Sequence, residues 1–184
     1  LEAAGATRHE VSLPGLELAR VAHAVTIASE MAVSMEAAGA KPSDHGLDVR
    51  VTLALARLLT QRDYVDAQRV RTRFCRDSAR AFEEVDLIAT PNAAGPAPAI
   101  PAGAALETGI TELQTTVSLM RFVFPANLNG YPALSVPAGY ANGLPLGLHL
   151  MGRPWEEGLL LRAAAVVEAG IERRAPRLHF RLLP

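Results

Sequence analysis

The sequence predicts an α/β fold in which a mixed β-sheet is flanked by helices. Apolar residues recur at helical spacing through residues 16–37 and again through residues 63–85. The apolar run VDLIATP predicts a strand, and PALSVPAGY and LPLGLHLMG predict two more, joined by a turn at Asn142-Gly143. Helices mixed with hairpin and crossover-like strands indicate a sheet covered by helices. No repeat or linker divides the 184 residues, so one domain is expected.

The first half of the chain is mainly helical in this prediction. The opening residues read as the end of a helix stopped by Gly5, followed by a short strand that closes at Pro14. After the helix at 16–37, a second helix is expected over residues 47–59. A longer third helix is expected to begin near Asp63, a residue type that suits the N-cap. Its many arginines stand beside acidic residues, which indicates a solvated face with ion pairs within the helix.

The second half alternates loops with shorter elements. The Pro-, Ala- and Gly-rich run at 92–105 predicts an irregular loop that wraps a site. A short helix is expected from residues 111 to 124, ending before Pro125. Prolines cannot donate to a β-ladder, so Pro137 and Pro145 are expected at strand ends, edges or bulges. A last helix is expected to open at Trp155, with two glutamates in its first turn.

Composition excludes several classes of protein. The formal net charge is -1, which argues against a nucleic-acid-binding face. Cys75 is the single cysteine, so neither an intramolecular disulfide nor a multi-cysteine zinc site can form. No apolar run approaches the roughly 18 residues that a transmembrane helix needs. The five histidines have no metal-ligand spacing, so no metal site is expected, and His149 reads as a structural residue of its strand.

The residues alone predict no catalytic centre. Neither a phosphate-binding glycine loop nor a Gly-x-Ser-x-Gly nucleophile elbow is present. Ser43, Asp44 and His45 are adjacent in sequence, but the members of a catalytic triad meet in space, so their adjacency indicates nothing. No catalytic residue is therefore assigned.

One segment carries a specific likeness to a known family. The run FPANLNGYPALSVPAGYANGLPLGLHLMGRPWEEGLLLRAAAVVE, residues 124–168, resembles the C-terminal end of the amidase signature enzymes. In that family N-L-x-G-x-P-A-L-S-V-P-x-G precedes G-L-P-x-G-L-Q-L-x-G-x-P and a final helix. Upstream, EEVDLIATPNAAGPAP resembles the family's strand and Thr-Pro loop, and YVDAQRVRTRF its long helix. His149 stands where the family usually has glutamine. The sequence of residues 118–140 is most similar to the fatty-acid-amide-hydrolase-like branch of the family.

The resemblance implies what the complete enzyme does. Family members hydrolyse amides with a serine nucleophile, a second serine in a cis peptide and a neutral lysine as base, without a metal or organic cofactor. Backbone N–H groups of a Gly/Ser-rich signature form the oxyanion hole. This sequence has no such run, and the surroundings of its one lysine, Lys41, do not match the family's lysine segment. No triad residue is carried over, and the chain alone is expected to be inactive.

The resemblance also implies a role for residues 1–184, as the C-terminal portion of a single amidase domain with no internal boundary. This portion would complete the sheet and form one wall of the amide pocket. The candidate substrate-binding residues are Thr90, Pro91, Met120, Val123 and Asn127. The expected partner is a small-molecule amide substrate in the intact enzyme. A homodimer and a cytoplasmic location are also expected.

Two other functions fit the same residues. The first is the amidase subunit of a tRNA-dependent amidotransferase, which would use this fold to deliver ammonia to partner subunits. The second is a non-catalytic product, either a truncated remnant or a fragment whose role is binding. Fatty acid amides, aryl amides, allophanate-like ureas and small aliphatic amides all use the amidase signature scaffold, so the sequence does not choose among these substrates.

Overall fold

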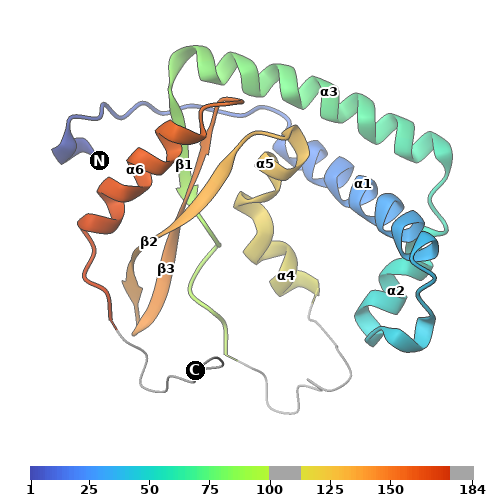
Figure 1. The fold of residues 1–184 in the computed structure, drawn as a ribbon. Coiled ribbons are helices and arrows are strands. Elements are labelled where there is room, and N and C mark those ends of the chain that lie inside the picture. Colours follow the sequence, from blue (N-terminus) through green and yellow to red (C-terminus); the bar gives the residue numbers. More distant parts are fainter. Residues whose placement is uncertain (100–112, 175–184) are drawn as a thin grey trace.

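The predicted α/β class is confirmed by a computed structural model that describes residues 1–99 and 113–174 (Figure 1). The helices are α1 (Leu16–Ala37), α2 (Leu47–Ala56), α3 (Gln61–Glu84), α4 (Leu113–Leu119), α5 (Phe124–Asn129) and α6 (Glu157–Ala169). Single 3₁₀ turns are η1 (Glu2–Ala4), η2 (Pro42–Asp44) and η4 (Met120–Phe122). The strands are β1 (Leu87–Pro91), β2 (Ala133–Ala141) and β3 (Leu144–Gly152). The end of the predicted loop at 92–105 and the start of the predicted helix at 111 lie outside the described residues.

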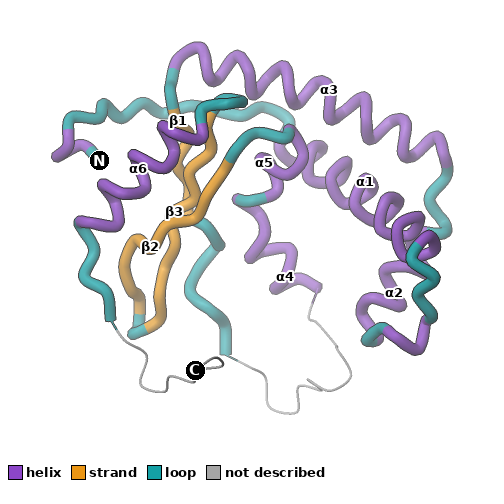
Figure 2. The backbone as a smooth tube through the Cα atoms, in the orientation of Figure 1, coloured by secondary structure: helices purple, strands orange, loops and turns teal. Residues whose placement is uncertain are grey.

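The three strands form a sheet in the order β1-β3-β2, and both pairings are antiparallel (Figure 2). The turn between β2 and β3 is the predicted one, because Asn142 (φ 52°) and Gly143 (φ 79°) both adopt the left-handed conformation that a two-residue hairpin favours. The register shifts between Pro137 and Gly139. Pro137 therefore lies at an irregularity of the ladder, as the sequence predicted.

Each face of the sheet is covered by a different set of helices. On one face, Leu160 of α6 packs against Val136 and Leu150. Side chains alternate along a strand, so the neighbours Ile88 and Met151 point to the opposite face. There they form a cluster with Ala81 and Phe82 of α3 and Ala126 of α5. The core thus has two layers separated by the sheet, and α6 lies on the side away from α4 and α5 (Figure 1).

The start of α3 differs from the prediction that Asp63 caps it. Thr60 is the N-cap residue, and Asp63 is the third residue of the helix. The Asp63 backbone N–H donates to Thr60 Oγ1 over 3.2 Å, and the Thr60 backbone N–H donates to Asp63 Oδ2 over 2.7 Å. The pair forms a capping box in which each side chain accepts from the other residue's backbone. The Thr60 hydroxyl also donates to Asp63 Oδ2 over 2.6 Å, and this hydrogen bond, together with the one from the Thr60 backbone N–H, lowers the pKa of the Asp63 carboxyl.

Two other predicted elements are corrected. The residues before Pro14 form no strand, although Gly5 (φ 93°) does end the short turn η1 as predicted. In place of one helix that ends before Pro125, the structure has α4, the turn η4 and a separate helix, α5. Pro125 lies in the first turn of α5. Proline is tolerated there because the first N–H groups of a helix have no intrahelical acceptor to lose.

The corner between β3 and α6 contains an unusual residue. Trp155 adopts a left-handed backbone conformation (φ 69°), and 93% of its surface is exposed. The helix begins after it, at Glu157, with Glu156 as the N-cap, and not at Trp155 as predicted. A left-handed conformation is uncommon for a bulky residue. Trp155 is therefore held outward by the backbone and contributes nothing to the core.

Helix α2 carries a row of exposed apolar side chains. Leu47, Val51, Leu55 and, just beyond the helix, Leu58 recur at helical spacing on α2 and are all exposed. We call this set the outer face of α2. None of the helices in the described residues is both long and apolar enough to cross a membrane.

Candidate functional site

A row of three polar side chains crosses the sheet on the face away from α6. Thr90 of β1 lies opposite His149 of β3, and His149 lies opposite Ser135 of β2. Thr90 Oγ1 and His149 Nδ1 are 3.4 Å apart, within hydrogen-bonding distance. All three residues share the side of the sheet on which Met151 packs against α5, because residues two apart on a strand face the same way.

His149 is the buried member of this row. Only 7% of its surface is exposed, whereas Thr90 is half-buried and Ser135 is exposed. Burial lowers the pKa of the His149 imidazole, because removal from water disfavours the charged form. The imidazole is therefore neutral at pH 7, with one nitrogen as a hydrogen-bond donor and the other as an acceptor.

Gly147 leaves room for two polar side chains, that of Ser135 in the row and that of Asn92 beside it. A Cβ atom at Gly147 would lie 2.9 Å from Ser135 Oγ and 3.0 Å from Asn92 Cβ. These side chains therefore lie directly over the backbone of β3 at this residue. The Asn92 backbone N–H also donates to the Gly147 carbonyl oxygen over 2.9 Å. The chain leaving β1 is thus attached to the sheet beside the polar row.

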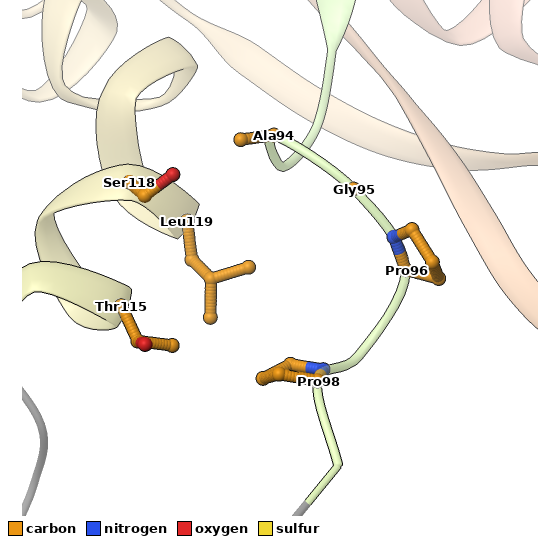
Figure 3. Close-up of a pocket in the computed structure, with 7 residues that line it drawn as sticks. All are labelled: Ala94, Gly95, Pro96, Pro98, Thr115, Ser118 and Leu119. Carbon is orange, nitrogen blue, oxygen red and sulfur yellow. The ribbon is translucent and has the colours of Figure 1, made fainter.

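The segment that follows Asn92 forms one side of a hollow. The hollow has a volume of about 410 Å³ and lies between the loop at 94–98 and helix α4 (Figure 3). Its lining residues are Ala94, Gly95, Pro96, Pro98, Thr115, Ser118 and Leu119. In Figure 3 the side chain of Leu119 points from the helix into the space opposite the two prolines. The walls are thus about equally polar and apolar, with two hydroxyl groups on the α4 side.

None of the five predicted wall residues lines the hollow. Thr90 faces His149, and Pro91, the next residue of β1, is exposed and by strand alternation points to the other face. Met120 adjoins the lining residue Leu119 but is exposed, Val123 is half-buried, and Asn127 is exposed on α5. Their assignment to a substrate pocket therefore stays a prediction.

The polar row supplies one imidazole and two hydroxyl groups. His149 approaches the Thr90 hydroxyl, but no described carboxylate is hydrogen-bonded to His149 in the way a base is oriented in a triad. Across residues 1–99 and 113–174, no group of three His, Cys, Asp or Glu side chains could hold a metal. Sequence reasoning had missed His149, Ser135 and Asn92 as a group. Strand alternation could have placed Ser135 and His149 on one face, but not the register that makes them neighbours.

Comparison with known proteins identifies relatives of this chain. The family profile described as Amidase matches residues 1–161. A fatty acid amide hydrolase from Medicago truncatula is 44% identical over 182 residues, which are 95% of this chain and 29% of that protein. One subunit of the glutamyl-tRNA(Gln) amidotransferase from Methanosarcina acetivorans is 30% identical over 200 residues, 96% of this chain and 41% of that protein.

The fold has a solved counterpart as well. A crystal structure of an amidase superposes with a TM-score of 0.79 at 29% identity, covering 93% of this chain and 39% of that one. The chain thus spans well under half the length of the proteins that it matches.

Proposed function

Since this chain belongs to the amidase signature family, we propose that it forms the C-terminal portion of a hydrolase that cleaves amide bonds outside peptides. The observation that carries the proposal is the match of the Amidase family over residues 1–161. In the complete enzyme, a serine outside the matched motifs would attack the amide carbonyl, release the amine and form an acyl ester. Water would then hydrolyse the ester. Residues 1–184 would complete the sheet and hold the substrate.

Within this family, fatty acid amides are the proposed substrate class. The fatty acid amide hydrolases from Medicago truncatula and other plants match at 42–44% identity over 86–95% of this chain. The amidotransferase subunits match either at 30–32% identity over 95–96% of it or at 40–42% over only 62–64%. The apolar part of the hollow beside α4, formed by Leu119 and the two prolines, supports this choice, because moving an alkyl chain out of water is favourable. The five predicted residues, Thr90, Pro91, Met120, Val123 and Asn127, are proposed to border the path of that chain.

The amidotransferase subunit is the second candidate, because its similarity extends over 96% of this chain. The two candidates differ in where the released amine or ammonia goes. A hydrolase releases a carboxylate and an amine into water, whereas an amidotransferase subunit passes ammonia to a partner.

The test compares two polypeptides: residues 1–184, and the same residues together with whatever coding sequence lies upstream in frame. We expect the longer protein to hydrolyse oleamide and to react with a fluorophosphonate probe for nucleophilic serines. We expect residues 1–184 alone to do neither. Labelling of residues 1–184 above the background of a heat-denatured sample would contradict the assignment. Ammonia release by the longer protein only in the presence of added partner subunits would favour the amidotransferase.

A homodimer and a cytoplasmic location are further parts of this proposal. The exposed outer face of α2 supports an assembly, because contiguous apolar patches on a surface often mark a contact with another chain. Light scattering after size-exclusion chromatography tests the dimer, which a monomeric mass would contradict. Fractionation of cells that express a tagged protein tests the location.

A further inference from the structure

We propose that His149 is a substrate-binding residue whose Nδ1 accepts a hydrogen bond from the Thr90 hydroxyl and whose Nε2–H donates to the carbonyl oxygen of an amide. The identity of the ligand rests on the proposed function. The arrangement of Thr90 and His149 does not, because it follows from the sheet itself.

The register of β1 and β3 brings the two side chains together. Thr90 and His149 are paired residues on adjacent strands, and their polar atoms are 3.4 Å apart. A hydroxyl can donate to an imidazole nitrogen only when that nitrogen carries no proton. With Thr90 as donor, the proton of the neutral ring is on Nε2. In the proposed arrangement the Thr90 hydroxyl is therefore matched to the Nε2–H tautomer of His149.

The second ring nitrogen has nothing to bind within the described residues. The one hydrogen bond of His149 there is the contact with Thr90, so Nε2 has no partner in residues 1–99 and 113–174. His149 is 7% exposed, and its Nε2 is not one of the buried polar atoms that lack a partner, so the Nε2–H group reaches the molecular surface. A carbonyl oxygen supplied by a ligand would satisfy this donor.

The surroundings of His149 favour a neutral ligand. The residues that share its sheet face are Thr90 and Ser135 across the strands and Gly147 and Met151 along its own strand, and none of these is charged. From α5, the residue in the cluster on this face is Ala126. Burial lowers the pKa of the imidazole, so the donor carries no charge at neutral pH. An uncharged donor in such surroundings suits an amide carbonyl better than a carboxylate, whose desolvation it does not offset.

The tautomer is measured first, because it tests the arrangement without any ligand. Long-range ¹H–¹⁵N correlation spectra of labelled residues 1–184 report which ring nitrogen carries the proton. At pH 7.5 we expect the Nε2–H tautomer of His149. Thr90→Ser, which keeps the hydroxyl, should preserve it. Thr90→Val, which has the same shape without the hydroxyl, should give a mixture of both tautomers. An Nδ1–H ring in the unmodified chain, or no change in Thr90→Val, would overturn the proposal.

The ligand is tested second, with hexanamide as the amide and hexanoate as the charged counterpart. Hexanamide should shift the Nε2 resonance of His149, and hexanoate should bind more weakly. His149→Gln keeps a side-chain N–H donor and should retain the affinity, whereas His149→Leu should weaken it about three- to tenfold, the range for one lost hydrogen bond. His23→Leu, at the other buried histidine, is the matched control and should leave the affinity unchanged.

The two proposals fail in different ways. If hexanamide leaves the His149 resonances unchanged, or if His149→Leu binds it as tightly as the unmodified chain does, the binding role is overturned even if the complete enzyme hydrolyses amides. If the complete enzyme hydrolyses no amide while hexanamide still shifts Nε2, the binding role holds and the proposed function is wrong.

Discussion

The guanidinium group of Arg153 donates two hydrogen bonds to the backbone carbonyl oxygen of Phe82, from Nε over 3.1 Å and from Nη2 over 2.9 Å. Nη2 also donates to the carbonyl oxygen of Val85 over 3.0 Å and forms an ion pair with Asp86 at 3.2 Å. Carbonyl groups in the last turn of a helix have no intrahelical donor. Arg153, just beyond β3, supplies that donor to α3 and joins the end of the helix to the end of the strand.

Replacing Arg153 with methionine should therefore destabilise the chain. We expect the free energy of unfolding to fall by about 1–3 kcal/mol, because two carbonyl groups lose a charged donor. Arg153→Lys should lose most of the same stability, since an ammonium group cannot reproduce the forked geometry. Urea unfolding followed by circular dichroism measures both. Arg162→Met, at an exposed arginine of α6, is the control. Equal losses in Arg153→Met and Arg162→Met would contradict the role of Arg153.

The buried side chain of Asn129 links three parts of the fold. Its Nδ2 donates to Ser78 Oγ of α3 over 3.3 Å, and its Oδ1 accepts from the Tyr131 backbone N–H over 2.9 Å. Asn129→Ala leaves the Tyr131 N–H without this acceptor and should reduce the free energy of unfolding by about 1–3 kcal/mol. Asn127→Ala, at an exposed asparagine of the same helix, should change it by less than about 0.5 kcal/mol. Similar urea midpoints for the two variants would count against the network.

The close contact above Gly147 predicts a steric effect. Gly147→Ala places a methyl group against Ser135 Oγ and Asn92 Cβ, and should cost about 1–3 kcal/mol of stability as an overpacked site does. Adding Ser135→Gly should recover part of the loss, because it removes one of the two obstructing side chains. Gly158→Ala has open space around the new methyl group and should be neutral or stabilising by up to about 1 kcal/mol. Equal urea midpoints for Gly147→Ala and Gly158→Ala would contradict the predicted clash of the new methyl group with Ser135 and Asn92.

Stability should fall as the pH falls below about 7. Burial lowers the pKa of both His23 and His149 from the ordinary histidine value near 6.5. Between that value and the lower folded-state pKa values, the unfolded chain binds more protons than the folded chain. Acid therefore favours unfolding in this window, with a slope of at most about 1.4 kcal/mol per pH unit for each histidine. Above the window both states are deprotonated, and these groups add no pH dependence.

Urea midpoints measured from pH 8 to pH 5.5 test this pH dependence. His23→Gln removes one titrating group, which lies with its ring 5.7 Å from the Phe124 ring, and should reduce the slope. His9→Gln, at an exposed histidine near the N-terminus, is the control and should leave the slope unchanged. A slope that neither His23→Gln nor His149→Gln reduces would show that other groups cause it.

The elements that could be predicted are those with local patterns. Helix α1 and the hairpin of β2 and β3 follow from apolar spacing and from one Asn-Gly turn, and they needed no information about distant residues. The start of α3 was predicted three residues late because Asp63 and Thr60 are both good cap residues, and only the reciprocal hydrogen bonds decide between them. The sequence predicts that a helix ends before Pro125, but proline suits the first turn of a helix equally well, and Pro125 lies in the first turn of α5.

The candidate site was harder to predict because its contacts join distant residues. Thr90 and His149 are 59 residues apart in the chain, and Arg153 and Phe82 are 71 apart. Such pairs depend on the strand register and on which helix end contacts which strand. A short stretch of sequence indicates neither of these two features. The family resemblance did place Thr90 in the region, but no periodicity could indicate that His149 was its partner.

The outward position of Trp155 decides which spectroscopic signal reports unfolding. It is the single tryptophan of the chain, and with 93% of its surface exposed its indole already meets water in the folded state. Its fluorescence should therefore change little on unfolding, which is why circular dichroism is the suitable signal. The same property makes the indole a reporter of association. A shift of its emission to shorter wavelength on addition of another polypeptide would locate the contact at the corner between β3 and α6.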